Sequence, residues 1–181
     1  MSGSVVLIGL SGSGKSTVGR EVAAELQLRF EDTDRNIEQS SGRSIADIFR
    51  TDGEAHFRAL EQQALRAACQ SQAVIATGGG AVLSEDNRRT MRHSNLVVWL
   101  DPPLDLLVAR LSRHQFDEVR PLLEGDLHMR LANLHLARSP LYAAAADIRL
   151  GGAALSEHEL EPTVRVIVTA YRRWLKEELF P

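Results

Sequence analysis

Short apolar segments alternate along the chain with longer segments in which apolar residues recur at helical spacing. The short segments are mostly continuous runs of Val, Ile, Leu and Ala, which is typical of parallel strands covered on both faces. They predict strands at residues 4–9, 29–33, 73–77, 95–100 and 147–150. The longer segments predict helices at residues 15–27, 54–69, 103–113, 126–139 and 156–177. This alternation predicts an α/β fold, a three-layer sandwich with a five-stranded parallel sheet.

The composition is that of an ordinary globular domain. The 181 residues are 44% apolar and 25% charged, with a net charge of -3, and no repeat or linker divides them. We therefore expect a single domain over residues 1–181, with no basic face for nucleic acid. The chain has no apolar run of membrane-spanning length and its start lacks the features of a secretory signal, so no membrane partner is expected. A single cysteine, Cys69, fits a reducing compartment, which predicts a cytoplasmic location.

A phosphate-binding loop is predicted after the first strand. The segment GLSGSGKST, residues 9–17, matches G-x-x-x-x-G-K-[ST] and has the required strand before it and helix after it. Its backbone N–H groups can surround phosphates at a helix N-terminus, with Lys15 between the outer phosphates and the Ser16 hydroxyl on Mg²⁺. The residues expected to bind the nucleotide are Gly12, Ser13, Gly14, Lys15, Ser16 and Thr17. ATP and Mg²⁺ are the expected cofactors, but this motif alone does not distinguish a kinase from a hydrolase, a motor or a switch.

Asp101 ends the fourth predicted strand and has two interpretations. It could be a metal-holding aspartate at a strand end, the Walker B arrangement. It could also be the N-cap of the helix that follows, because Pro102 and Pro103 come next. We favour the cap.

Asp32 and Asp34 lie one residue apart at the end of the second predicted strand. They could share a metal, cap a helix or have separate roles. In an extended chain, residues two apart face the same side at a distance of about 6.6 Å, which is too long for both to bind one Mg²⁺ tightly. This spacing favours one carboxylate near the water shell of the metal and the other on a substrate group. The alternative is that Asp34 caps the helix RNIEQSS.

Three glycines and an arginine indicate a second ligand. Gly78, Gly79 and Gly80 close the third predicted strand, and consecutive glycines mark a place where a ligand approaches the backbone closely. Arg58 lies on a predicted helix with Glu61 three residues later, close enough to orient it. Its planar guanidinium can bind a carboxylate through two hydrogen bonds.

Two further arginines lie in the second half of the chain. The polar segment 113–123 predicts a mobile lid, on which Arg120 could neutralise charge on a transferred phosphoryl group. Arg138 falls near the end of a predicted helix. A lone arginine there is usually solvated or satisfies the helix C-terminus.

In this order, these motifs resemble the shikimate kinases, which are small P-loop kinases of the nucleoside-monophosphate-kinase type. The resemblance runs from about residue 4 to about residue 150 and rests on GLSGSGKST, DTDRNIEQSSGRSIADIF, DGEAHFRALE, TGGGAV, VRPLL and RSPLY. It implies a P-loop NTPase fold with a lid. It also implies transfer of the γ-phosphate of ATP to the 3-hydroxyl of shikimate, in the pathway to aromatic amino acids.

The resemblance assigns the substrate side to residues about 33–61 and to two later segments. Asp34 would hold the ring hydroxyls of shikimate and orient or deprotonate the attacking one. Arg58 and Arg138 would clamp the carboxylate of shikimate, and the glycines 78–80 would line it.

The nucleotide side follows in the same way. Asp32 would reach Mg²⁺ through water, Arg110 would lie by the adenine, and Arg120 would reach the phosphates from a lid at about residues 112–124. The catalytic residues implied are Lys15, Asp34 and Arg120. The stretch GGAALSEHELEP after the fifth strand does not match the adenine-side loop of the family, so no base contacts are assigned there.

Two other functions compete with this one. A related kinase of aminoshikimate or gluconate would keep the carboxylate clamp, although the segment after the second strand is not of the gluconate kinase type. A non-catalytic ligand-sensing module should have lost the lysine, the acid pair or the glycine triplet, and all of them are present. The family is commonly monomeric, so a monomer is expected.

Overall fold

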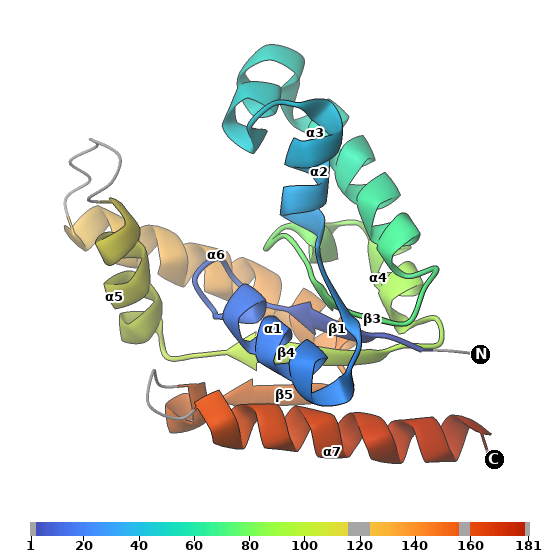
Figure 1. Ribbon diagram of the computed structural model, residues 1–181. Helices are drawn as coiled ribbons and strands as arrows, with labels where there is room; N and C mark the ends of the chain where they lie inside the picture. Colours follow the sequence, from blue (N-terminus) through green and yellow to red (C-terminus); the bar gives the residue numbers. More distant parts are fainter. Residues whose placement is uncertain (1–2, 116–123, 156–159, 180–181) are drawn as a thin grey trace.

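The structure is a computed structural model that describes residues 3–115, 124–155 and 160–179. Five strands form one parallel sheet in the order β2-β3-β1-β4-β5 (Figure 1). They are β1 (Val5–Ile8), β2 (Arg29–Asp32), β3 (Ala73–Ala76), β4 (Leu96–Asp101) and β5 (Ile148–Gly151). The predicted fold class is confirmed. The chain leaves β1 toward β2 and β3 on one side and later forms β4 and β5 on the other, so the crevice where ligands bind is expected beside the carboxyl end of β1.

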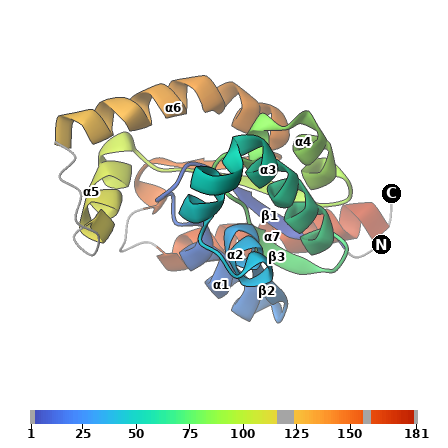
Figure 2. The ribbon, with the colours of Figure 1, turned by 90° about the horizontal axis from the view of Figure 1, so that it is seen from above.

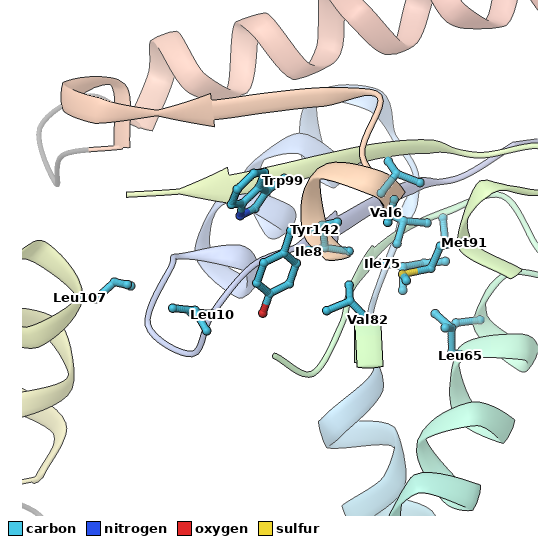
Figure 3. Packing of buried hydrophobic residues seen from close by; sticks show 14 of the residues in the cluster. Val6, Ile8, Leu10, Leu65, Ile75, Val82, Met91, Trp99, Leu107 and Tyr142 are labelled. Atoms are coloured by element: carbon cyan, nitrogen blue, oxygen red, sulfur yellow. The ribbon is translucent and has the colours of Figure 1, made fainter. Parts of the chain in front are cut away.

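Helices cover both faces of this sheet, because each strand buries alternate residues on opposite sides. Val5 and Leu7 pack with α1 (Lys15–Leu26) and α7 (Leu160–Leu179), while Val6 and Ile8 pack toward the other helices. These are α3 (Ile45–Ala68), α4 (Glu85–Arg92), α5 (Leu104–Gln115) and α6 (Glu124–Ala145), and Figure 3 shows their core. The view from above places α6 and α1 on opposite sides of the sheet (Figure 2).

The substrate segment predicted at about residues 33–61 forms a pair of helices that rises from the strand ends (Figure 1). It contains α2 (Thr33–Ser41) and the first part of α3, which are held together by a small cluster of Ile37, Ile48 and Phe57. α3 is longer than the predicted helix 54–69 because it starts at Ile45 and continues across a break at Gly53. Gly53 has φ 81° and ψ 171°, a conformation that only glycine adopts readily.

Three short elements were not predicted. α4 is strongly polar, and Met91 is its one buried apolar residue, so it has too little apolar periodicity to be recognised. Two turns of 3-10 helix, η1 (Ala81–Leu83) and η2 (Gly152–Leu155), follow β3 and β5. No helix in the described ranges combines the length and hydropathy of a membrane span.

Candidate functional site

A cavity of about 520 Å³ opens at the carboxyl ends of the strands. Its lining brings together groups that the sequence predicted separately, namely the phosphate loop, both aspartates of β2–α2, the middle glycine of the triplet and an arginine of α5. The predicted residues in the lining are Gly12, Ser13, Gly14, Lys15, Ser16, Thr17, Asp32, Asp34, Gly79 and Arg110. The cavity thus connects the predicted nucleotide site with Asp34 and Gly79 of the predicted second-ligand site. The other predicted residues of that second site do not line it, namely Arg58, Gly78, Gly80 and Arg138.

The phosphate loop wraps around the side chain of its own lysine. Gly14 is the N-cap of α1 with φ 93°, a left-handed conformation that favours glycine. Lys15 is only 8% exposed, and its Nζ donates to the carbonyls of Gly9 at 3.0 Å and Leu10 at 2.8 Å. Burial lowers the pKa of Lys15 to about 8, against the opposing effect of the carboxylates of Asp34 and Asp32. A bound phosphate would supply the negative charge that this buried ammonium lacks.

Asp32 joins the phosphate loop to the start of α2. Its Oδ2 accepts a hydrogen bond from the Ser16 hydroxyl at 2.7 Å, and its Oδ1 accepts one from the N–H of Arg35 at 3.3 Å. Asp32 is therefore the N-cap of α2, and the alternative prediction that Asp34 is the cap is wrong. The extended geometry assumed for residues 32–34 is also wrong, because the chain turns into a helix directly after Asp32. Both carboxylates nevertheless line the cavity.

Asp34 and Glu61 converge on Gly78. A Cβ at Gly78 would lie 2.6 Å from Asp34 Oδ1 and 2.9 Å from Glu61 Oε1, so only glycine fits between the two carboxylates. Both oxygens are buried and accept no hydrogen bond from the part of the chain that the structure describes. Burial raises the pKa of Asp34, and the neighbouring Asp32 carboxylate raises it further. Buried acceptors of this kind are available to the hydroxyl groups of a ligand.

Arg58 is oriented as the sequence predicted. Its Nη1 donates to Glu61 Oε2 at 2.9 Å, and Glu54 binds its other edge at 3.0 Å. Burial disfavours the charge of Arg58, but the hydrogen bonds and charges of Glu61 and Glu54 together outweigh it and raise the pKa of Arg58. Burial also raises the pKa of Glu61, and Arg58 opposes this shift. A side chain at Gly80 would overlap the Arg58 guanidinium, which places Arg58 directly against the glycine triplet.

Arg138 reaches the same triplet from α6. Its Nη1 donates to the Gly79 carbonyl at 3.0 Å, so it is neither a solvated surface arginine nor a helix cap. Tyr142, one turn further along α6, donates its hydroxyl to the same carbonyl at 2.6 Å. Sequence reasoning missed Tyr142, because a lone tyrosine in a helix has no local signal for a contact with a loop 63 residues away.

The prediction that Asp101 caps α5 is wrong. α5 begins at Leu104, and the Asp101 carboxylate instead binds His135 Nε2 at 2.9 Å and Arg149 Nε at 2.9 Å. Asp101 does not line the cavity either. Its buried charge is compensated by groups from α6 and β5 and fixes α6 to the end of β4.

The end of the cavity beside Arg110 contains residues that the sequence could not place. Arg110 donates to the Gly12 carbonyl at 3.3 Å and to the Leu155 carbonyl at 2.6 Å, so it links the phosphate loop to η2. Leu155, Leu160 and Thr163 complete this end. They belong to or adjoin the stretch that was left unassigned. Arg120 and the centre of the predicted lid lie outside the described residues.

The oxygen donors near the phosphate loop fit Mg²⁺. Mg²⁺ bound with phosphates takes one or two protein ligands and completes its shell with water and phosphate oxygens. The hydroxyl of Ser16 and the carboxylate of Asp32, hydrogen-bonded to each other at the wall of the cavity, offer such a set. A group of three or more His, Cys, Asp or Glu side chains around one point is absent from the described ranges.

Comparison with known proteins gives a consistent result. A family profile described as "Shikimate kinase" matches residues 11–170. The chain is 48% identical to the shikimate kinase of Symbiobacterium thermophilum over 81% of this chain and 84% of the relative. It is 42% identical to that of Moorella thermoacetica over 97% and 98%. The solved shikimate kinase of Acinetobacter baumannii in complex with shikimate superposes with a TM-score of 0.84 at 30% identity, covering 94% of this chain and 93% of that one.

Proposed function

This chain belongs to the shikimate kinase family and has shikimate kinase activity with ATP as the phosphoryl donor, and we propose that the reaction takes place in the cavity at the carboxyl ends of its strands. The family assignment confirms the function predicted from the sequence, ahead of a gluconate or aminoshikimate kinase and a sensing module. One observation carries the proposed location. The phosphate loop and Asp34, whose Oδ1 accepts no hydrogen bond from the described residues, line the same cavity.

The nucleotide half of the cavity binds the phosphates of ATP. The loop from Gly12 to Thr17 offers its backbone N–H groups at the N-terminus of α1, where an anion is favoured. Lys15 gives up its contacts with the loop carbonyls and places its charge on the outer phosphates. Ser16 and Asp32 would hold Mg²⁺, which when bound neutralises charge on the phosphates. Arg110 supports the loop beside the base.

The second half of the cavity holds shikimate, because the charged groups there match the carboxylate and the ring hydroxyls of shikimate. Arg58 lies against Gly80, Arg138 binds the Gly79 carbonyl, and both bind the carboxylate of shikimate. Asp34 accepts hydrogen bonds from its ring hydroxyls. Because burial raises the pKa of Asp34 from its ordinary value, the carboxylate of Asp34 is also better suited to accept the proton of the attacking hydroxyl. Positioning and charge neutralisation then supply most of the catalysis, as in other phosphoryl transfers.

We also propose that the protein acts as a monomer in the cytoplasm. The proposal of a monomer rests on the resemblance to the shikimate kinases, which are commonly monomeric.

Shikimate should stimulate ADP release strongly in a coupled assay with ATP and Mg²⁺. Gluconate and nucleoside monophosphates should not, because neither combines one carboxylate for the two arginines with a ring polyol for Asp34. Aminoshikimate, tested beside shikimate, measures how far the groups around Asp34 select the attacking hydroxyl. An equal rate of ADP release with and without shikimate would contradict the proposed site.

Replacing Arg58 by Ala should raise the KM for shikimate roughly 10- to 100-fold, the scale of hydrogen bonds to a charged group. ATP binding should change little, because Arg58 lies against Gly80 and does not line the nucleotide half. Steady-state kinetics with each substrate varied in turn measures both effects.

The matched control is Arg66→Ala, an exposed arginine on the same helix. Its kinetics should equal those of the parent. Arg58→Ala also leaves the Glu61 carboxylate buried without its partner, so thermal unfolding of each variant should be measured beside the kinetics. Loss of ATP affinity with unchanged shikimate affinity would show that Arg58 is not part of a carboxylate clamp.

A further inference from the structure

The hydroxyl of Tyr142 is a buried polar group that the mechanism above does not use. The side chain is 1% exposed, and its ring stacks on Trp99 with centroids 5.5 Å apart. Figure 3 shows the ring among the apolar side chains of the core, with the hydroxyl pointing away from Trp99. Phenylalanine would serve such packing equally well. A buried hydroxyl is costly unless it makes a hydrogen bond, so the bond that Tyr142 makes needs an explanation of its own.

That hydrogen bond is made to the centre of the glycine triplet. The Tyr142 hydroxyl donates to the Gly79 carbonyl at 2.6 Å, and Arg138 Nη1 donates to the same oxygen at 3.0 Å. A carbonyl oxygen has two lone pairs, so these two donors saturate it. Burial raises the pKa of Tyr142 to about 12, and the hydroxyl therefore remains a donor throughout the neutral range.

The direction of this carbonyl determines the direction of the next N–H. The carbonyl of Gly79 and the N–H of Gly80 belong to one planar trans peptide, in which they point in opposite directions. Because the carbonyl is held toward α6, the N–H of Gly80 is turned away from α6. This N–H donates no hydrogen bond to any of the described residues. Glycine backbone has many accessible orientations, so a peptide between two glycines needs such a restraint.

The donor itself is firmly supported. Trp99 on β4 stacks on the ring of Tyr142, and Asp101 on the same strand binds His135, two turns earlier on α6. The hydroxyl is thereby held in place by the rigid sheet. By contrast, the long side chain of Arg138, which shares the acceptor, must also engage the carboxylate of the substrate.

We propose that Tyr142 is a positioning residue for shikimate, whose hydroxyl fixes the Gly79–Gly80 peptide so that the Gly80 N–H is presented to the substrate. The inference rests on the proposed role of the glycine triplet in lining shikimate. Tyr142 does not contact the reacting atoms and acts through the peptide that it holds.

The test is Tyr142→Phe, which keeps the ring and removes the hydroxyl. The KM for shikimate should rise about 5- to 10-fold, the scale of one buried hydrogen bond, while the KM for ATP stays within about twofold. In ¹⁵N-labelled protein, the amide signal of Gly80 should move, because its peptide has lost a hydrogen bond at the carbonyl.

Tyr171→Phe is the matched control. Tyr171 is 2% exposed, stacks on Trp174, and donates its hydroxyl to the Gly3 carbonyl at 2.6 Å, all on the other face of the sheet. This variant should lose a similar amount of thermal stability and keep the parental KM for shikimate and the Gly80 amide signal.

The outcomes separate this inference from the proposed site. If Tyr142→Phe has parental kinetics while Arg58→Ala loses shikimate affinity, the site stands and the role of Tyr142 is refuted. An equal rise in KM for the Tyr142 and Tyr171 variants would reduce Tyr142 to a stability role. If shikimate does not shift the Gly80 amide of the parent protein, then the triplet does not line the substrate and both proposals fall.

Discussion

Replacing Lys15 by Met is expected to lower kcat by about 10²- to 10³-fold, the effect of removing one preorganised electrostatic contact. Met keeps the length and apolar stem of the side chain but has no charge to place on the outer phosphates of ATP. The fold should survive, because a buried ammonium whose pKa is lowered by burial is itself unfavourable in the ligand-free protein. Turnover at saturating ATP and shikimate, with thermal unfolding of both proteins, measures the two effects.

The only other lysine of the sequence gives the control. Lys176 is exposed on α7, so Lys176→Met makes the same chemical change away from the cavity and should leave kcat unchanged. A Lys15→Met variant with more than a tenth of the parental kcat would show that the phosphate loop does not act through this charge.

The same lysine predicts a pH dependence of nucleotide binding. In the free protein the pKa of Lys15 is about 8, and negative phosphates favour the protonated form. The affinity for ATP should therefore fall as the pH rises through about 8, because binding must then also take up a proton. Calorimetric titrations across this range should show the loss in the parent and not in Lys15→Met.

The features that sequence alone predicted well have local signals. The three central strands, β1, β3 and β4, are short and mostly apolar runs that are buried on both faces, and the phosphate loop has its strand, its glycines and its helix within a few residues. The contact between Arg58 and Glu61 is also local, because three positions along a helix bring the two side chains together. Such features depend little on the rest of the fold.

The geometry of Asp32 and Asp34 could not be predicted, because it depends on the residue at which the strand ends. The hydrogen bond from the Arg35 N–H to Asp32 starts α2 one residue before the second aspartate. An extended-chain estimate of their separation therefore used the wrong conformation. The conclusion that the two carboxylates face different neighbours still holds, since Asp32 binds Ser16 and Asp34 lies against Gly78.

Contacts between distant segments were predicted least well. Asp101 was predicted to be a helix cap, because no neighbouring residue in the sequence indicates its contacts with His135 and Arg149. The contact of Tyr142 with the Gly79 carbonyl could not be predicted for the same reason, and neither could that of Arg110 with the Leu155 carbonyl. In each case the order of the strands places the two partners side by side, and the sequence pattern does not specify that order.

Replacing Asp34 by Asn is expected to lower kcat by about 10²- to 10⁴-fold, the range of a general acid–base group. Asn has the same shape and can still hydrogen-bond a ring hydroxyl, so the KM for shikimate should change less than kcat. It cannot accept the proton of the attacking hydroxyl or provide a charge to orient it.

Asp32→Asn is the matched variant, and its main effect should be a higher Mg²⁺ requirement, because Asp32 lies beside Ser16. If Asp32→Asn lost turnover while Asp34→Asn raised the Mg²⁺ requirement, the two roles would have to be exchanged.

The stability of the Asp34→Asn protein provides an independent measurement. Burial and the neighbouring Asp32 raise the pKa of Asp34 above its usual 3.8, so the folded protein binds its proton more tightly than the unfolded chain. The stability contributed by that proton is fully present below about pH 3.8 and is lost as the pH rises through the folded-state pKa. At neutral pH the ionised carboxylate therefore destabilises the ligand-free protein, and Asn should raise the Tm there. This gain should shrink as the pH falls toward 4.

A lower Tm for the Asn variant at pH 7 would mean that Lys15 and Arg58 stabilise the Asp34 charge more than burial opposes it. The carboxylate would then be a weaker base than the mechanism requires.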